Sequence, residues 1–210
     1  MTAASGPSDS AGWIPGVAAR RSPHFDRRPL GAVVDLLVLH FISLPAGCFE
    51  GERVDELFMG TLDADAAGLP DLKGLRVSSH FFIRRSGEVR QYVSVFDRAW
   101  HAGLSNFRGR NACNDFSVGI ELEGTEADPF TDAQYDALRD LIPKIRSLVP
   151  LASATGHEFI APGRKTDPGP FFDWRRLEAM LPDGMKPAIS VEDCDRAMLA
   201  ERARALKTAG

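Results

Sequence analysis

The stretch VVDLLVLHFIS, at residues 33–43, decides the fold that the sequence predicts. It is a nearly continuous apolar run rich in Val and Leu, and its length and composition are typical of a strand buried on both faces. DFSVGIELEG, at residues 115–124, reads as another strand, and LASATGH, at residues 151–157, as a short last one. These three runs predict a sheet at the centre of the protein.

Two further patterns lie between the first and second of these strands. SSHFFIRRSGEVRQYVSVF, at residues 78–96, has apolar-rich runs on either side of Ser86-Gly87, which is typical of a hairpin. ERVDELFMG, at residues 52–60, can form a short helix. Residues 97–114 have little periodicity, so they predict irregular structure.

The helices of the second half carry recognisable end signals. Thr131 and Gln134 form a capping box that begins a helix over residues 132–148, whose apolar residues recur at helical spacing. Pro143 inside this helix predicts a kink or an early stop. Asp173 can cap a final helix with the sequence WRRLEAML. Strands therefore come first and helices later, which predicts one α/β domain of the mixed α+β kind around a central sheet.

The two ends of the chain differ from this domain. A chain of 210 residues suits a single domain, which we place at residues 13–182. Residues 1–12 are small and polar and predict a disordered N-terminus. Residues 183–210 form a C-terminal tail, in which a helix can begin at Ser190.

The charge, the apolar runs and the cysteines of the sequence predict the cellular compartment and argue against some classes of partner. The formal charge of -4 and the pI of about 5.7 argue against a nucleic-acid partner, which favours basic faces. No apolar run reaches the roughly 18 residues of a membrane span, and the first residues lack the basic start and apolar core of a secretory signal. Cys48, Cys113 and Cys194 are widely spaced, which suits a reducing cytoplasm rather than a disulfide framework. We expect a cytoplasmic monomer without nucleic-acid or membrane partners.

A loop dense in Gly and Pro carries three side chains of interest. TGHEFIAPGRKTDPGP, at residues 155–170, contains His157, Lys165 and Asp167. Such a stretch should be neither a regular helix nor a central strand. Asp167 precedes Pro168, which favours an extended backbone at the aspartate. The sequence therefore predicts that a stiff loop presents these side chains.

A metal site is one use for such a loop. His40 ends the first apolar strand, where functional side chains often occur. Together with His157 and Asp167 it supplies two imidazoles and one carboxylate, and zinc in hydrolases commonly has three protein ligands plus water. The spacing contains no HExxH motif. The same donors also suit iron(II), so a non-haem iron oxygenase is an alternative.

Two acids lie inside an apolar strand, which is costly unless they are paired or functional. Alternation along the strand places Glu121 and Glu123 on the same face, so either could be the inward one. A carboxylate near metal-bound water could accept its proton. Lys165 could stabilise the oxyanion that forms when hydroxide attacks an amide.

Seven segments, in order from about residue 13 to residue 181, match a known family. They are SPHFDRRP, LLVLHFISLP, LRVSSHFFIRRSGEVRQYV, RAWHAGLSNFRGR, CNDFSVGIELEGT, FTDAQYDAL and GHEFIAPGRKTDPGP. By these segments the chain resembles the AmpD-type 1,6-anhydro-N-acetylmuramoyl-L-alanine amidases of bacterial cell-wall recycling. These are zinc amidases related to phage-lysozyme amidases and peptidoglycan recognition proteins.

The resemblance implies a role for each candidate residue. It implies that His40, His157 and Asp167 are zinc ligands, that Glu121 activates water, and that Lys165 stabilises the tetrahedral intermediate. It implies a central mixed sheet flanked by helices, with the zinc in a groove on one side. The implied partner is a small muropeptide, and the implied reaction is hydrolysis of the amide between N-acetylmuramic acid, in its 1,6-anhydro form, and L-alanine.

The resemblance also points to residues that bind substrate. Arg76 matches a position near the peptide, where an arginine can pair with a carboxylate. Trp100 and His101 match the wall of the groove. Two departures affect how the substrate is held: Phe41 follows the first metal histidine where Asn is frequent, and Ala112 stands where a basic residue is common.

Two other classes of function remain as alternatives. Some relatives in the wider family only recognise peptidoglycan, and these usually lack a metal ligand, whereas the whole set is present here. A cysteine hydrolase could use Cys48 or Cys113 with His101, although no nucleophile motif surrounds either cysteine. The sequence therefore favours the zinc amidase.

Overall fold

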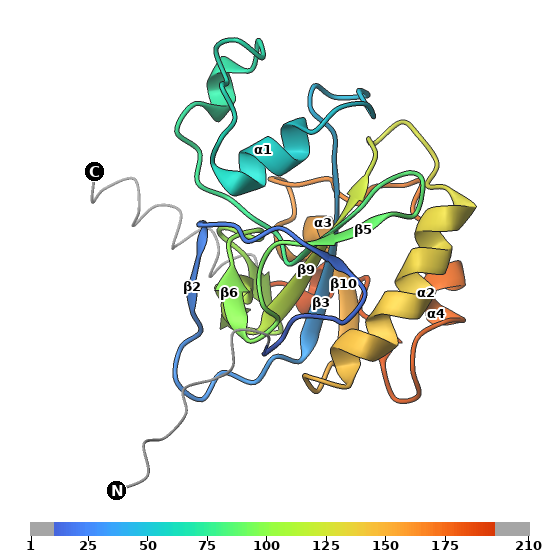
Figure 1. Cartoon of the computed structure of the whole chain (residues 1–210). Helices are drawn as coiled ribbons and strands as arrows, with labels where there is room; N and C mark the ends of the chain where they lie inside the picture. The colour runs from blue at the N-terminus through green and yellow to red at the C-terminus, as the bar shows by residue number, and fades with distance from the viewer. Residues whose placement is uncertain (1–10, 196–210) are drawn as a thin grey trace, which may run out of the picture.

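The computed structural model describes residues 11–195, and a seven-stranded mixed sheet lies at the centre of this part of the chain (Figure 1). In spatial order the strands are β1 (Ala18–Ala19), β5 (Val89–Gln91), β4 (Phe81–Ile83), β9 (Ser117–Glu123), β3 (Leu36–Ile42), β10 (Ser153–Gly156) and β11 (Lys186–Pro187). β4 and β5 are antiparallel, and the other neighbours in this sheet run parallel. The predicted central mixed sheet is confirmed.

The two long strands, β3 and β9, are buried on both faces. Leu37 and Leu39 of β3 belong to the main apolar core, whereas Leu36 and Val38 pack in a second cluster on the other face. A strand covered on both sides has no polar face to present to water, and its sequence is apolar at successive positions. This double burial explains the run that identified β3 in the sequence.

Helices cover both faces of the sheet, as Figure 1 shows. α2 (Asp132–Arg146) and α4 (Trp174–Glu178) pack in the same core as Leu39. α1 (Arg53–Met59) packs with Phe82, whose side chain points to the opposite face from its neighbours in β4. The sheet is therefore sandwiched, which confirms the mixed α/β class.

The start of α2 is as predicted, but its end is not. Thr131 Oγ1 accepts from the backbone N–H of Gln134 at 3.2 Å, and the Thr131 N–H donates to Gln134 Oε1 at 3.0 Å, which completes the capping box. Of the two effects predicted for Pro143, a kink or an early stop, the early stop was wrong, because the helix continues to Arg146. Pro143 lies in the last turn, where its missing N–H removes a single helical bond, and its carbonyl still accepts from Ser147 at 3.0 Å.

Two other local predictions are confirmed. β4 and β5 form the hairpin around Ser86-Gly87, and Gly87 has a φ of 86°, a conformation that glycine adopts without strain. Asp173 Oδ1 accepts from the N–H of Arg176 at 2.9 Å and caps α4.

The prediction that residues 97–114 are irregular was partly wrong. β6 (Asp97–Ala99) pairs with β2 (Phe25–Arg27), and β7 (Asn106–Phe107) forms a small hairpin with β8 (Arg110–Asn111). Strands of two or three residues are too short to show an alternating pattern, so the sequence gives no signal for them. Single turns of 3-10 helix cover Pro70–Leu72, Cys113–Asp115 and Val191–Asp193.

The loop of residues 155–170 also differs from its prediction at its start. Thr155 and Gly156 end β10, and α3 (His157–Ile160) follows at once. The expectation of neither strand nor helix was therefore wrong for residues 155–160. The Gly and Pro residues that prevent regular structure begin only at Pro162.

The ends of the described part pack onto the domain. β11 lies within the predicted tail and pairs with β10, and a 3-10 turn follows Ser190, while residues 196–210 fall outside the described part. The disorder expected at residues 1–12 is wrong for Ala11 and Gly12, whose carbonyls accept from Ser94 Oγ at 2.9 Å and from the N–H of Val95 at 3.1 Å, while residues 1–10 also fall outside the described part. The division of the chain at residue 182 remains a prediction. Within residues 11–195 no helix has the length and apolar character needed to cross a membrane.

Candidate active site

The carboxyl ends of three parallel strands bring the candidate residues together. His40 lies near the end of β3, and its partner in the register of β9 is Glu121. On the other side of β3, Gly156 of β10 pairs with Leu39, so that His157, the next residue, lies beside His40. Ligand sites of parallel sheets commonly lie at this end of the strands. The topology thus joins residues more than a hundred positions apart in the chain.

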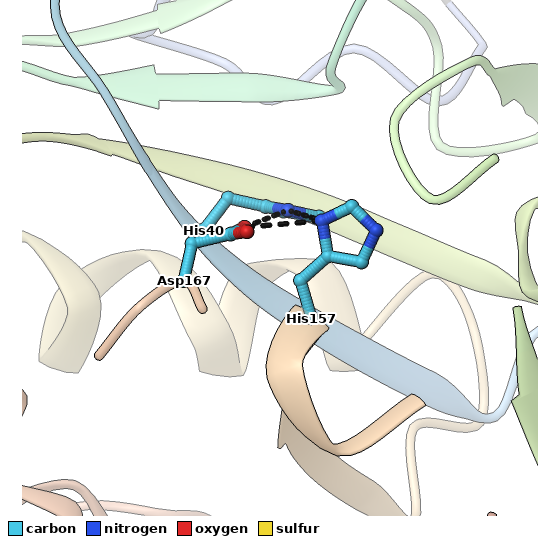
Figure 2. A group of neighbouring side chains, drawn as sticks. All are labelled: His40, His157 and Asp167. Atoms are coloured by element: carbon cyan, nitrogen blue, oxygen red, sulfur yellow. Dashed lines mark hydrogen bonds and ion pairs between the residues drawn. The ribbon is translucent and has the colours of Figure 1, made fainter. Parts of the chain in front are cut away.

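Three donor atoms converge at this edge of the sheet, as Figure 2 shows. Oδ2 of Asp167 lies 2.8 Å from Nδ1 of His40 and 3.1 Å from Nδ1 of His157, and the two nitrogens are 3.0 Å apart. Ligands bound to one tetrahedral zinc ion at about 2.0–2.1 Å are separated by about 3.3 Å. The three residues are buried and could hold a metal ion.

The other nitrogen of each imidazole is also held. Nε2 of His157 lies 3.0 Å from the carbonyl oxygen of Ala102, which can only accept. Nη2 of Arg164 is farther from Nε2, at 3.3 Å, and donates to two backbone carbonyls, so we assign the proton to Nε2. Nδ1 of His157 then has a free lone pair that points toward the Asp167 carboxylate. A nitrogen lone pair and a carboxylate oxygen in contact repel each other unless a cation lies between them. Nε2 of His40 lies 2.9 Å from Nδ1 of His101.

Charge in the site is arranged for cation binding. Burial, and then the neighbouring His157, lower the pKa of His40 to about 4, which leaves its imidazole neutral at pH 7 with a lone pair to donate. Burial alone raises the pKa of Asp167, but the two imidazoles beside it, His157 and His40, outweigh burial and hold that pKa well below its usual range. A neutral imidazole and an ionised carboxylate are the forms that bind metal ions.

The structure distinguishes the two acids of β9. Glu123 Oε2 accepts from the N–H of Arg85 at 2.9 Å, and Oε1 lies 3.4 Å from the Arg84 guanidinium. Glu121 Oε2 is buried and has no hydrogen-bond partner among the residues that the structure describes. Burial, and then the Asp167 carboxylate, raise the pKa of Glu121 well above its usual range. Glu123 thus resembles a structural acid, whereas Glu121 resembles an acid poised to exchange a proton.

The loop after α3 presents Lys165 and Asp167 from a well-bonded frame. The N–H of Glu158 donates to the carbonyl of Asp167 at 2.8 Å, and the N–H of Lys165 donates to the carbonyl of Ala161 at 3.1 Å. Gly156 permits this closure, because a Cβ there would lie 2.6 Å from Cδ of Pro168. The side chain of Lys165 is exposed, and Lys165 and Glu121 line the same cavity.

A cavity of about 450 Å³ opens onto this group of side chains. Seven of the predicted site residues line it: His40, His157, Asp167, Glu121, Lys165, Trp100 and His101. Arg76 does not line it, but lines an adjoining cavity of about 280 Å³ that shares Leu57, Leu72 and Leu75 with the first. The guanidinium of Arg76 lies 5.4 Å from the centre of the Trp100 ring, so the two cavities meet at this pair.

Sequence reasoning missed two contributors to the site. Nη2 of Arg164 donates to the carbonyls of Ala102 at 2.9 Å and Leu104 at 2.7 Å. Arg164 therefore connects the loop after α3 to the carbonyl of Ala102, which also contacts His157. Nothing in the local sequence marks this arginine. Gly119, in the middle of β9, has the ring of His101 against it. A glycine inside a strand indicates a close approach, so this signal was present in the sequence.

The cysteine alternative loses its geometric basis. The cavity that includes His101 is lined, in the described part of the chain, by residues other than Cys48 and Cys113. Burial raises the pKa of Cys113 to about 12. A thiol that stays protonated at neutral pH is a poor nucleophile.

Comparison with known proteins identifies the class that this fold and site define. Residues 30–170 match the N-acetylmuramoyl-L-alanine amidase family, and the chain belongs to that family. It is 52% identical over 175 residues to the 1,6-anhydro-N-acetylmuramyl-L-alanine amidase AmpD of Salmonella typhimurium strain SL1344, a match that covers 81% of this chain and 92% of the relative.

Two solved structures resemble the protein as well. A crystal structure of a selenomethionine derivative of AmpD matches with a TM-score of 0.79 and 49% identity, over 81% of this chain and 97% of the other. The amidase AmiD from E. coli, in complex with the substrate anhydro-N-acetylmuramic acid-L-Ala-D-γ-Glu-L-Lys, matches with a TM-score of 0.54 and 29% identity, over 76% of this chain and 62% of the other. The predicted family and fold are confirmed.

Proposed function

We propose that the protein hydrolyses the amide bond between the lactyl group of N-acetylmuramic acid and L-alanine, with a zinc ion held by His40, His157 and Asp167. The observation that carries the proposal is the convergence of these three donor atoms beside a buried acid that lacks a partner among the described residues. Family membership supplies the bond that is cleaved.

The names of the relatives support a particular substrate and setting. The Salmonella relative is named for the 1,6-anhydro sugar, and the AmiD complex contains an anhydro-muramoyl peptide called its substrate. We therefore propose the 1,6-anhydro form as the preferred sugar and peptidoglycan recycling in the cytoplasm as the setting. We also propose that the protein acts as a monomer and has neither nucleic-acid nor membrane partners.

Glu121 is the proposed proton carrier of the reaction. When bound, zinc supplies a nucleophile derived from water at neutral pH and polarises the amide carbonyl. Glu121 accepts the proton that water loses as its oxygen adds to the carbonyl carbon, and delivers it to the nitrogen of L-alanine as the C–N bond breaks. The raised pKa of Glu121 suits this exchange, because a base is most effective when its pKa approaches the working pH.

Lys165 is the proposed stabiliser of the negative charge that develops on the carbonyl oxygen. Lys165 lines the same cavity as the three donor residues and is carried by the loop that also carries Asp167. A positive charge that is positioned before the reaction stabilises a developing oxyanion without the cost of reorganisation.

The two adjoining cavities offer room for the two parts of a muropeptide. The Trp100 ring is stacked with that of His24 at 6.2 Å and lies 5.4 Å from the Arg76 guanidinium. Trp100 lines the larger cavity, whereas His24 and Arg76 line the smaller one. We propose that the sugar lies against Trp100 and that Arg76 pairs with a carboxylate of the peptide, because arginine binds carboxylates through two parallel hydrogen bonds. His101 lines the same wall.

A direct test uses the zinc-loaded protein with anhydro and reducing muramoyl tripeptides, and product masses as the readout. The proposal expects free tripeptide and the free sugar, faster release from the anhydro substrate, and loss of the reaction with chelator followed by recovery with zinc. Binding without cleavage would instead identify a peptidoglycan-recognition module. Metal analysis of the purified protein separates zinc from iron, and oxygen-dependent product would support the oxygenase.

A further inference from the structure

His101 was expected on the wall of the groove, but its closest polar contact lies behind the metal site. Its Nδ1 is 2.9 Å from Nε2 of His40, and the two rings meet edge to face with centroids 5.0 Å apart. We propose that His101 is a positioning residue, whose Nδ1 accepts the Nε2 proton of His40 and thereby keeps the Nδ1 lone pair of His40 directed at the metal. This inference rests on the proposed zinc site.

The direction of the hydrogen bond follows from the surrounding donors. A neutral imidazole has one N–H and one lone pair. Nδ1 of His40 faces the Asp167 oxygen at 2.8 Å and the Nδ1 of His157 at 3.0 Å, and it can bind an ion only with its lone pair. The proton of His40 must then lie on Nε2, and His101 must accept it at Nδ1. Partners of this kind fix the tautomer and orientation of ligating histidines.

The far side of His101 is held in a matching way. With Nδ1 as the acceptor, its proton lies on Nε2, which is 3.3 Å from the hydroxyl oxygen of Ser117. His40, His101 and Ser117 thus form a chain of hydrogen bonds that leads from the metal site to the start of β9. His157 has the equivalent support from a backbone carbonyl, so both histidine ligands have a partner on the nitrogen away from the site.

Gly119 is what allows His101 to reach this position. A Cβ at Gly119 would lie 2.6 Å from Cγ and 2.7 Å from Nδ1 of His101, closer than non-bonded atoms approach. The N–H of Gly119 is itself held, because it donates to Nδ1 of His80 at 3.0 Å. The strand therefore cannot easily move away from the ring, and a side chain at this position must displace His101 and its acceptor from His40.

Two variants of His101 separate the acceptor from the ring. His101→Phe keeps a ring of similar size but removes the acceptor, whereas His101→Asn keeps an oxygen close to the position of Nδ1. Gly119→Ala displaces the ring without changing it. His24→Phe is the matched control, because His24 is a buried histidine that lines the adjoining cavity and bonds to the carbonyl of Val77 rather than to a candidate ligand.

Three measurements are made on the purified protein. Competition with a chromophoric chelator gives the zinc affinity, and thermal unfolding reports stability. NMR of the ¹⁵N-labelled histidine rings in the zinc-loaded protein gives the tautomer of His40 and shows whether its Nε2–H is hydrogen-bonded. His101→Phe should bind zinc about 10- to 100-fold more weakly and lose the signal of a hydrogen-bonded Nε2–H at His40. Gly119→Ala should do the same, while His101→Asn should lose less than about tenfold. His24→Phe should bind zinc as the unchanged protein does.

Several results would overturn the inference. The inference fails if His101→Phe keeps both its zinc affinity and a hydrogen-bonded Nε2–H at His40. It also fails if His101→Asn loses as much zinc affinity as His101→Phe, because the effect would then come from ring packing. An equal loss in His24→Phe would also refute it. Since none of these readouts uses hydrolysis, a failure of the proposed amidase activity remains distinguishable: the zinc and tautomer results stand whether or not muropeptides are cleaved.

Discussion

Glu121 and Glu123 lie two residues apart in one strand, yet the structure predicts opposite outcomes when each is changed to Gln. Glu121 is buried, and its Oε2 lacks a hydrogen-bond partner within the described residues, so that its charge is costly to the fold. Glu123 is paired with Arg84 and with the N–H of Arg85. Glu121→Gln should therefore raise stability and strongly lower turnover, whereas Glu123→Gln should lower stability and leave turnover close to its original value.

The pH dependence of stability shows in which direction Glu121→Gln should change the free energy of unfolding. The pKa of Glu121 is raised in the folded state, because of burial and then the Asp167 carboxylate, so the folded protein retains a proton that the unfolded chain has lost. The stability of the metal-free protein then falls as pH rises above about 4.3, the usual pKa of an unfolded Glu, toward the folded pKa. Glu121→Gln removes this decline, so its advantage should be absent near pH 4 and grow toward pH 7.

The magnitudes follow from the same contacts. Each unit by which the pKa of Glu121 in the folded protein exceeds its pKa in the unfolded chain removes about 1.4 kcal/mol of stability as the pH rises through that interval. Loss of the charge on Glu123 weakens two interactions with the arginine pair and should cost about 1 to 2 kcal/mol. Removal of a general base should lower kcat about 10²-fold or more in Glu121→Gln.

Urea unfolding of the chelated proteins between pH 4 and pH 7 measures the stability, and hydrolysis of a muramoyl tripeptide by the zinc-loaded proteins measures the rate. The reasoning fails if Glu121→Gln is no more stable than the unchanged protein at pH 7. It also fails if that variant keeps near-normal turnover, or if Glu123→Gln loses as much activity as Glu121→Gln.

Three other changes test separate parts of the site and fold. Asp167→Ala should lose bound metal and activity together, and full metal content by elemental analysis would remove Asp167 from the ligand set. Lys165→Ala should lower kcat more than it raises KM, since its charge acts on the developing oxyanion; an effect on KM alone would indicate a ground-state contact. A stop after Met185 removes β11 and the turn at Val191–Asp193. The backbone bonds of Lys186 and Ala188, the bond from Thr155 Oγ1 to the carbonyl of Ala188 and the contacts of Asp193 with Arg108 are then lost, which should cost at least about 3 kcal/mol in urea unfolding. Unchanged stability of this shortened chain would show that β11 contributes nothing to the fold.

The sequence by itself determined the elements whose signals are local. The apolar runs of β3 and β9, the turn at Gly87 and the caps at Thr131 and Asp173 each follow from the chemistry of a few neighbouring residues. The candidate ligands came from the same kind of local pattern, together with the resemblance to a family. Those features could be predicted because burial on both faces requires an apolar run, a positive φ favours glycine, and a helix cap requires a polar side chain, each within one short segment.

Only the tertiary structure decided which of these residues meet and what each one touches. β11 and the hairpin of β7 and β8 are too short to have a pattern of their own. β11 pairs with β10, more than 30 residues earlier, and the turn of the hairpin donates from the N–H of Arg108 to the carbonyl of Asp193. Glu121 and Glu123 are equivalent in the sequence, and Arg84 and Arg85 make them different in the fold. The position of His101 behind His40 depends on a contact across 61 residues of chain. The register of the sheet selects hydrogen-bond partners from strands that are distant in the sequence. The residues on either side of a side chain therefore do not show which partner it will have.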